Sequence, residues 1–243
     1  MRSNVVRSVF VVSFLCATAA AHAQTIDEIV AKNLAAKGGA EKWSSVKAVK
    51  MTGKISMQGM ELPMTVYAKR PNSTRQEVAF QDQKIVQAFD GTMAWGINPM
   101  MGPGPQAAPP AIAEMVSARA DFDGALINYK AKGTVIELVG KEKLDGRDVY
   151  HLKVTGKGNN VQQYYLDAET GLEAKTTAEV DMMGTGQKQM LEVVMSNYQK
   201  VEGISLPHTV AQTIDGKPML QMTLDKIELN PTLDETLFKM PKQ

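Results

Sequence analysis

The chain contains 243 residues, of which 44% are apolar and 22% are charged, and its 27 basic and 26 acidic residues leave a net charge of +1. A chain of this length forms one large domain or two small ones, and this apolar fraction is sufficient for a buried core. The balanced charge lacks the basic excess of nucleic-acid-binding proteins, so we expect no nucleic-acid partner.

The first 23 residues have the features of a secretory signal peptide. Arg2 and Arg7 form a positive n-region, and Val9–Ala21 is an apolar h-region. Ala21-His22-Ala23 is a cleavage site of the A-x-A type. The apolar segment is too short for a stable membrane span, so cleavage before Gln24 is favoured over an uncleaved anchor. The sequence therefore predicts a soluble, exported protein in the periplasm of a Gram-negative bacterium.

The only cysteine, Cys16, lies inside this leader. The residues before it, Ser13-Phe14-Leu15, are a poor context for a lipid-modified bacterial cysteine. We therefore expect a mature chain without a thiol, a disulfide or a lipid anchor of its own.

A helix is predicted for Thr25–Lys37, because apolar residues recur there at a spacing of three to four. Thr25 is a candidate N-cap, and acidic residues follow it at the positive end of the helix dipole. Gly38-Gly39 ends the helix. Trp43 follows in a short second segment.

The next fifty residues predict five antiparallel strands joined by short turns. The first has the clearest pattern, because Met51, Ile55 and Met57 alternate with polar residues. The five predicted strands are Val49–Met57, Leu62–Ala68, Arg75–Gln81, Lys84–Asp90 and Thr92–Ile97.

A proline-rich segment and a helix are predicted to separate the two halves of the chain. Asn98–Pro110 contains five prolines, which remove backbone donors and fix φ, so we expect neither strand nor helix there. An amphipathic helix is predicted from Pro109-Pro110 through about Lys130. Gly124 is a point at which it could be interrupted, and Gly133 ends it.

The remaining chain predicts seven further strands in an antiparallel meander. They are Thr134–Val139, Asp148–Thr155, Gln162–Leu166, Leu172–Asp181, Gln187–Tyr198, Ser205–Ile214 and Met219–Leu229. Asp167 and Gly171 supply the turn chemistry of the clearest hairpin, and Asp234-Glu235 begins a short helical turn. We expect residues 24–243 to form a single domain with a five-strand half, a helical insertion and a seven-strand half.

Catalysis has little support in the mature chain, which has two histidines. His151 falls on the polar face of its strand and is predicted at the surface, whereas His208 alternates with apolar residues and is predicted to point inward. No serine lies in a G-x-S-x-G elbow, and no thiol nucleophile remains after cleavage. We therefore expect a protein that is not an enzyme and that needs no metal or other cofactor.

The 16 methionines have three interpretations. Soft thioether ligands suit copper(I), and Met57 with Met60, or Met219 with Met222, have a suitable spacing. Ordinary core packing is the second interpretation. The third is a deformable apolar pocket, because unbranched methionine adapts to ligands of variable shape. The scarcity of aromatic residues favours aliphatic walls, which match straight acyl chains.

Four motifs resemble the LolA/LolB-like family of periplasmic lipoprotein carriers, in the family's order and over essentially the whole mature chain. The motifs are Lys69-Arg70-Pro71-Asn72, Asp90-Gly91-x-x-x-Trp95-x-x-Asn98-Pro99, Tyr165-Leu166-Asp167 with Thr170-Gly171-Leu172, and Asp234 with Leu237-Phe238 and Pro241. The resemblance implies an α+β, mainly β fold. It is an unclosed antiparallel β-barrel, a curved sheet of about 11–12 strands with helices covering its concave face.

The resemblance also implies roles for two residues. Arg70 matches the arginine that hydrogen-bonds the helical lid and holds it closed in the empty carrier, and its rigid fork of donors suits carbonyls at helix ends. Trp95 matches a tryptophan that packs the sheet or lines the cavity. The sequence departs from the family in the Pro/Gly/Met-rich Asn98–Pro110 segment and in the early Gly-Gly-terminated helix followed by Trp43.

We therefore expect a binding and carrier protein that holds acyl chains of lipoproteins or other lipids in an apolar cavity, for transport towards the outer membrane. Its partners would be the acylated lipoprotein or lipid and inner- and outer-membrane transfer proteins, and we expect a monomer. The alternative is a periplasmic sensor or regulatory module of the same fold, whose lipid occupancy controls a protein contact. The expected ligand-binding residues are Met51, Ile55, Met57, Met64, Val66, Phe80, Phe89, Met93, Trp95, Met115 and Phe122.

Overall fold

The computed structural model of the chain describes residues 24–57, 59–181 and 185–242, so the predicted signal peptide lies outside the described residues. The helices are α1 (Ile26–Ala36), α2 (Ala40–Ser45), α3 (Pro110–Arg119) and α4 (Tyr129–Lys132), with the short 3-10 helices η1 (Lys157–Asn159) and η2 (Glu235–Phe238). The strands are β1 (Ala48–Met57), β2 (Met60–Lys69), β3 (Ser73–Phe80), β4 (Gln83–Phe89), β5 (Ala94–Ile97), β6 (Gln106–Ala107), β7 (Val135–Leu144), β8 (Arg147–Thr155), β9 (Val161–Asp167), β10 (Glu173–Val180), β11 (Gln189–Val201), β12 (Ile204–Ile214) and β13 (Lys217–Leu229).

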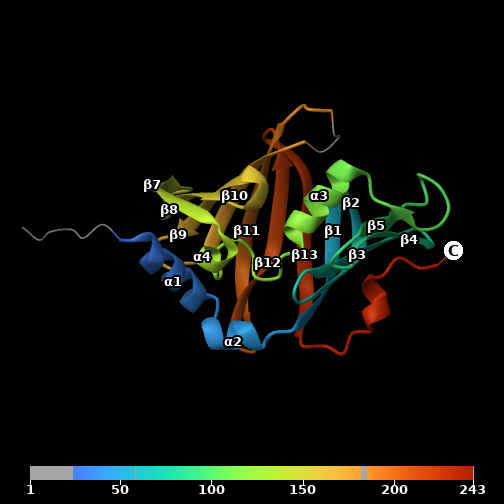
Figure 1. The fold of residues 1–243 in the computed structure, drawn as a ribbon, viewed down its shortest axis with the longest axis horizontal. Helices are drawn as coiled ribbons and strands as arrows, with labels where there is room; N and C mark the ends of the chain where they lie inside the picture. Colours follow the sequence, from blue (N-terminus) through green and yellow to red (C-terminus); the bar gives the residue numbers. More distant parts are fainter. Residues whose placement is uncertain (1–23, 58, 182–184, 243) are drawn as a thin grey trace, which may run out of the picture.

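These strands form one antiparallel sheet in the order β6-β5-β4-β3-β2-β1-β13-β12-β11-β10-β9-β8-β7. Each half of the chain is a meander, and the first strand of the chain, β1, pairs with the last, β13. The sheet curves but does not close, and β6 and β7 are its two edges (Figure 1). The structure thus confirms the predicted mainly β fold, an unclosed antiparallel barrel.

The sheet has 13 strands rather than the predicted 11–12 because the proline-rich segment contains a short strand. Gln106 and Ala107 form β6 and pair with Gly96 and Trp95. Neither residue is a proline, so both keep the backbone N–H group that a sheet requires. The prediction that Asn98–Pro110 contains no strand was therefore wrong at these two positions.

Alternate residues along the strands point to one face of the sheet, here called the inner face, on which α1, α2 and α3 pack. The register places Ile55 of β1 opposite Met222 of β13, and Met64 of β2 opposite Val78 of β3. Ile55, Met64 and Val78 are only 5%, 3% and 9% exposed and form one buried cluster. The protein's own side chains therefore fill this part of the inner face.

The first helix, α1, begins at the predicted N-cap. The Thr25 hydroxyl accepts a hydrogen bond from the N–H of Glu28 at 3.2 Å, and the Glu28 carboxylate accepts one from the N–H of Thr25 at 2.8 Å. This capping box satisfies donors that a helix start would leave unpaired. Ile29 then packs against Leu152 and Leu166, which fixes α1 to the inner face of β8 and β9.

The amphipathic helix predicted to run to about Lys130 ends instead at Arg119, the last residue of α3. The residues that follow, 121–128, form turns and are here called the connecting segment. In it, the Asp121 carboxylate accepts a hydrogen bond from the N–H of Asp123 at 3.1 Å. Gly124 has φ of +66°, which a helix does not accommodate. The predicted interruption at Gly124 and the predicted end at Gly133 are confirmed, because α4 resumes at Tyr129 and Gly133 is its C-cap. The continuous helix between them was wrong, because apolar residues of these turns mimic helical spacing while packing on the sheet.

The opposite face of the sheet, here called the outer face, carries the C-terminal segment. Trp95 is fully buried there, and its Nε1–H donates to the carbonyl oxygen of Phe238 at 2.7 Å. Nη1 of Arg75 donates to the carbonyl oxygen of Leu237 at 3.0 Å. The helical turn predicted from Asp234-Glu235 is present as η2, and these contacts hold it against the sheet.

Candidate functional site

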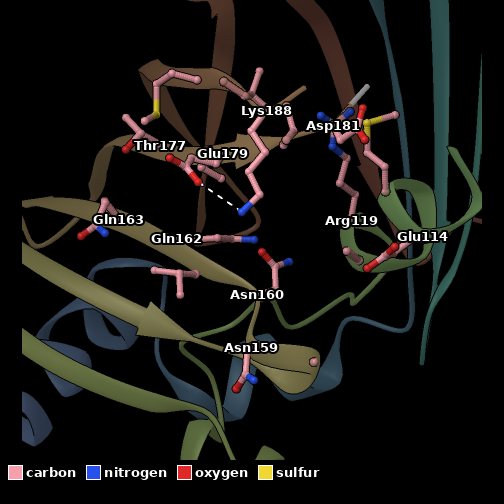
Figure 2. Close-up of a pocket in the computed structure, with 18 of the residues that line it drawn as sticks. Glu114, Arg119, Asn159, Asn160, Gln162, Gln163, Thr177, Glu179, Asp181 and Lys188 are labelled. Carbon is pink, nitrogen blue, oxygen red and sulfur yellow. Dashed lines mark hydrogen bonds and ion pairs between the residues drawn. The ribbon is translucent and has the colours of Figure 1, made fainter. Parts of the chain in front are cut away.

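A groove of about 590 Å³ lies between α3 and the strands β9, β10 and β11 (Figure 2). Binding sites for small molecules commonly occupy about 300–1,000 Å³, so this groove has the volume of a ligand site. Both the helix and the strands contribute apolar side chains. The apolar residues that line it are Ala111, Met115, Ala118, Val161, Ala178, Val180, Met190 and Leu191.

The helix α3 forms one wall of the groove, and its opposite side is attached to the sheet. Val116 and Ala120, four residues apart, pack against Phe89 of β4 and Ala94 of β5. Met115 lies on the side that faces the groove. A helix of ten residues is thus fixed along one edge by mostly small side chains, while its other edge borders open space.

Polar residues also line the groove, and two acids among them, Glu179 and Asp181, already have partners within the protein. Nζ of Lys188 lies 3.3 Å from the Glu179 carboxylate. The Asp181 carboxylate accepts hydrogen bonds from the N–H groups of Thr185 at 3.1 Å and Gly186 at 2.7 Å. The charges of these two acids are therefore offset within the groove wall.

The guanidinium of Arg119, at the end of α3, differs from these two acids in its contacts. Within the part of the chain that the structure describes, it has neither an ion-pair nor a hydrogen-bond partner. The side chain stays exposed, yet the groove walls remove part of the water around it, and this desolvation lowers the pKa of Arg119 from its usual value. Arginine nevertheless remains charged in proteins, so this end of the groove carries a positive charge.

A second group of polar contacts surrounds Arg70, which follows β2. Its Nε–H donates to the carbonyl oxygen of Val46 at 2.7 Å, and Nη2 donates to that of Trp43 at 3.1 Å. Nη2 also lies 2.7 Å from Oδ1 of Asp123 in the connecting segment. The guanidinium carbon lies 4.6 Å from the centre of the Phe122 ring. Arg70 therefore contacts both the end of α2 and the connecting segment.

Asp123 receives two hydrogen bonds on the same oxygen, because Nε1–H of Trp43 also donates to Oδ1 at 2.9 Å. Partial burial opposes ionisation of this carboxyl, but the hydrogen bonds from Arg70 and Trp43 outweigh that effect. Together they hold the pKa of Asp123 below its usual value. Near neutral pH, Asp123 is therefore the charged partner of Arg70.

Of the predicted ligand-binding residues, the structure brings only Met115 into the groove between α3 and β9–β11. Several others lie on the inner face but within packed clusters: Ile55, Met64 and Val66 beside Val78, Met51 and Phe122 near α2, and Phe89 beneath α3. Met57 and Met93 are each 37% exposed, outside these clusters, and Phe80 is half-buried at the end of β3. Trp95 lies on the outer face, away from all of them.

The groove residues that the sequence did not single out come from the second half of the sheet. Gln162, Ala178 and Leu191 are brought together by the pairing of β9 with β10 and of β10 with β11. The period-two pattern of these strands could have placed them on one face. No local signal, however, indicates that α3 leaves this part of the face uncovered.

The two histidines of the described chain are parts of the sheet. His151 is half-buried rather than at the surface, because its ring stacks on Tyr165 at 4.5 Å and Nε2 lies 2.9 Å from Oε1 of Gln163. His208 is buried, as predicted, with Nδ1 3.1 Å from the carbonyl oxygen of Leu206. Among the described residues, no three His, Cys, Asp or Glu side chains are grouped so that they could hold a metal ion.

Neither a known family nor a curated protein matches the sequence of this chain. Solved structures do match its fold. A LolA superfamily protein from Nitrosomonas europaea superposes with a TM-score of 0.59 at 14% identity, over 89% of this chain and 98% of that one. An outer membrane lipoprotein-sorting protein domain from Vibrio parahaemolyticus gives a TM-score of 0.55 at 13% identity, over 87% and 95% of the two chains. A DUF1329 family protein from Desulfovibrio piger gives 0.55 at 12%, over 88% and 97%.

These likenesses establish a LolA-like fold for the chain, as the four sequence motifs implied. Identities of this size relate folds and do not transfer a ligand or a partner. Within residues 24–57, 59–181 and 185–242, none of the helices has the length and apolar character needed to cross a membrane.

Proposed function

From the LolA-like fold and the groove beside α3, we propose that this protein binds lipids or lipoproteins and holds their acyl chains between α3 and the strands β9–β11. The observation that carries the proposal is the groove itself, which has a ligand-sized volume and apolar residues on both walls. The protein acts as a carrier rather than as an enzyme. It works in the periplasm, where it delivers acylated cargo towards the outer membrane.

The energetics of such binding follow from desolvation alone. Each methylene removed from water contributes roughly 0.8 kcal/mol, so a half-buried acyl chain provides several kcal/mol without any cofactor. Met115 and Met190 on opposite walls can change rotamers at low cost, which suits chains of different length and branching.

Two features support α3 as the part of the protein that moves when cargo enters or leaves. Its attachment to β4 and β5 uses mostly small side chains, Val116 and Ala120 with Ala113, together with Ile112. Arg70 holds the connecting segment that follows it, through the 2.7 Å contact with Asp123. Arg70 thus stabilises the closed arrangement, and a transfer partner that prefers the open arrangement shifts the equilibrium towards release.

The test is native mass spectrometry on the full chain, expressed with its own leader in a Gram-negative bacterium and purified from the periplasm. We expect a co-purifying acylated species that delipidation removes and that added palmitoyl lipid restores. Ala178→Trp, which fills the groove, abolishes this uptake. Ser196→Trp places the same ring on an exposed position of β11 outside the groove and leaves uptake intact.

A chain that never takes up lipid, before or after delipidation, contradicts the proposal. In that case co-purification of a stable protein partner would favour the sensor or regulatory module with the same fold. Uptake that is equally strong in Ala178→Trp would show that lipid binds elsewhere on the protein.

A further inference from the structure

The groove is not uniformly apolar, and its charged groups determine which amphiphile it accepts. Among the described residues, five titratable side chains line it: Glu114, Arg119, Glu179, Asp181 and Lys188. Acids outnumber bases by three to two among them, so the net charge of the lining alone does not predict the sign of a ligand. The expected sign of the ligand's charge therefore depends on which of these side chains already have a partner within the protein.

Three of the five charges are offset within the protein. Glu179 lies 3.3 Å from Lys188, and Asp181 accepts two backbone hydrogen bonds from residues 185 and 186. This leaves Arg119 and Glu114, which both belong to α3. In Figure 2 the Arg119 side chain extends from the helix towards Asp181, which follows β10, whereas the Glu114 carboxylate lies apart from the Arg119 guanidinium, near the helix.

Hydrogen-bond donors from β9 and the turn before it face the same space as Arg119. Oε1 of Gln162 accepts a hydrogen bond from the Tyr164 hydroxyl at 3.1 Å, which directs the Gln162 amide nitrogen towards the middle of the groove (Figure 2). Asn160 also points its side-chain amide into the groove. A cationic fork and neutral amide donors therefore lie around one cavity, with apolar residues such as Ala178 and Leu191 beneath them.

An arginine in the last turn of a helix has a structural role even without a ligand, because its positive charge interacts favourably with the helix dipole. That effect does not require the side chain to enter a groove or to lose water there. The planar guanidinium of arginine matches carboxylate and phosphate oxygens with paired hydrogen bonds, and such charge-assisted bonds are strong where water is partly excluded.

We propose that Arg119 binds the anionic head group, a carboxylate or a phosphate, of an amphiphile whose acyl chain lies along the apolar floor of the groove. This inference rests on the proposed function and narrows it, because it selects acidic amphiphiles over uncharged acylated ones. Gln162 and Asn160 donate further hydrogen bonds to the same head group, and Lys188 remains paired with Glu179.

The experiment compares three ligands with the same palmitoyl chain: palmitoyl lysophosphatidate, palmitate and uncharged palmitoylglycerol. Each is titrated against the purified full chain by displacement of the neutral dye Nile red. We expect both anionic ligands to bind about tenfold or more tightly than palmitoylglycerol, and this ratio to fall with added salt. The two anionic ligands distinguish a phosphate from a carboxylate as the preferred head group.

Arg119→Gln reduces the ratio between anionic and uncharged ligand to about twofold or less, and Arg119→Lys gives an intermediate ratio. Lys54→Gln is the matched control, because it removes one positive charge from an exposed position of β1 outside the groove and keeps the wild-type ratio. A wild-type ratio near one, or a full ratio in Arg119→Gln, overturns the inference while leaving the proposed function intact. Failure of all three ligands to bind overturns both.

Discussion

Oδ1 of Asp123 lies 2.7 Å from Nη2 of Arg70, so a residue that follows the second strand holds the segment that follows α3. The same guanidinium donates to the carbonyl oxygens of Val46 and Trp43 at the end of α2. One side chain thus joins α2, the connecting segment and the first half of the sheet. In the function proposed above, this junction restrains α3 and thereby the width of the groove.

Arg70→Leu removes the hydrogen bonds that the guanidinium donates to two carbonyl oxygens and its contact with Asp123, which keeps only the hydrogen bond from Nε1–H of Trp43. We expect the free energy of unfolding to fall by about 1–3 kcal/mol, because partly buried polar groups lose their hydrogen bonds. We also expect faster proteolysis within the connecting segment and faster release of bound palmitate. Urea denaturation, limited proteolysis and stopped-flow release of the ligand measure the three effects.

Lys69→Leu is the control for this variant, because Lys69 is the neighbouring residue and its ammonium pairs with the exposed carboxylate of Glu235 at 2.8 Å. An exposed ion pair of this kind contributes about 0–1 kcal/mol, so its loss has a small effect on unfolding and none on release. Equal behaviour of the two variants would show that Arg70 does not restrain α3.

The stability that the contact between Arg70 and Asp123 contributes depends on pH, because Asp123 must be ionised. Because the hydrogen bonds from Arg70 and Trp43 outweigh partial burial and lower the pKa of Asp123 in the folded protein, the ionised carboxylate stabilises the fold above its usual pKa. That contribution is lost as the pH falls through the lowered folded pKa. We expect Asp123→Asn to be less stable than wild type at neutral pH, with a difference that shrinks steadily below about pH 5.

The measurement is urea denaturation of both proteins at neutral pH and at several acidic values. Asp82→Asn, in an exposed turn between β3 and β4, changes the net charge equally and should show no such convergence. A difference between Asp123→Asn and wild type that stays constant down to strongly acidic pH would exclude the assigned role.

We expect Trp95 to stabilise the folded protein and not to contact the ligand. Trp95→Phe removes the 2.7 Å hydrogen bond to the carbonyl of Phe238 and leaves space beneath the C-terminal segment. We expect a loss of about 1–3 kcal/mol in the free energy of unfolding, with an unchanged dissociation constant for palmitate. A weaker affinity for palmitate at unchanged stability would instead place this residue in the ligand site, as the sequence motif implied.

Much of the fold could be predicted because its information is local. The alternation of Met51, Ile55 and Met57 with polar residues, and the turn chemistry of Asp167 and Gly171, specify strands and their ends over short windows. The helical insertion was predicted too long because Phe122 pairs with Trp43 through space, at 6.0 Å between ring centres, and not through helical spacing.

The groove could not be predicted in the same way, because it arises where two distant parts of the chain fail to fill the space between them. Met115 was predicted as a site residue for its apolar character, but Arg119 and Gln162 look like ordinary solvent-facing residues in the sequence. Ile55 and Met64 have the apolar character expected of a cavity, yet in the paired strands they pack against Val78.

The central claim is that an acyl chain lies between α3 and the strands β9–β11, and photo-crosslinking tests it most directly. A palmitate that carries a diazirine near the end of its chain is bound to the full protein and irradiated, and the modified peptides are identified by mass spectrometry. We predict adducts in α3 and in β10 or β11, which Ala178→Trp abolishes. Adducts confined to the outer face, or to the β1–β3 cluster around Met64, would contradict the account.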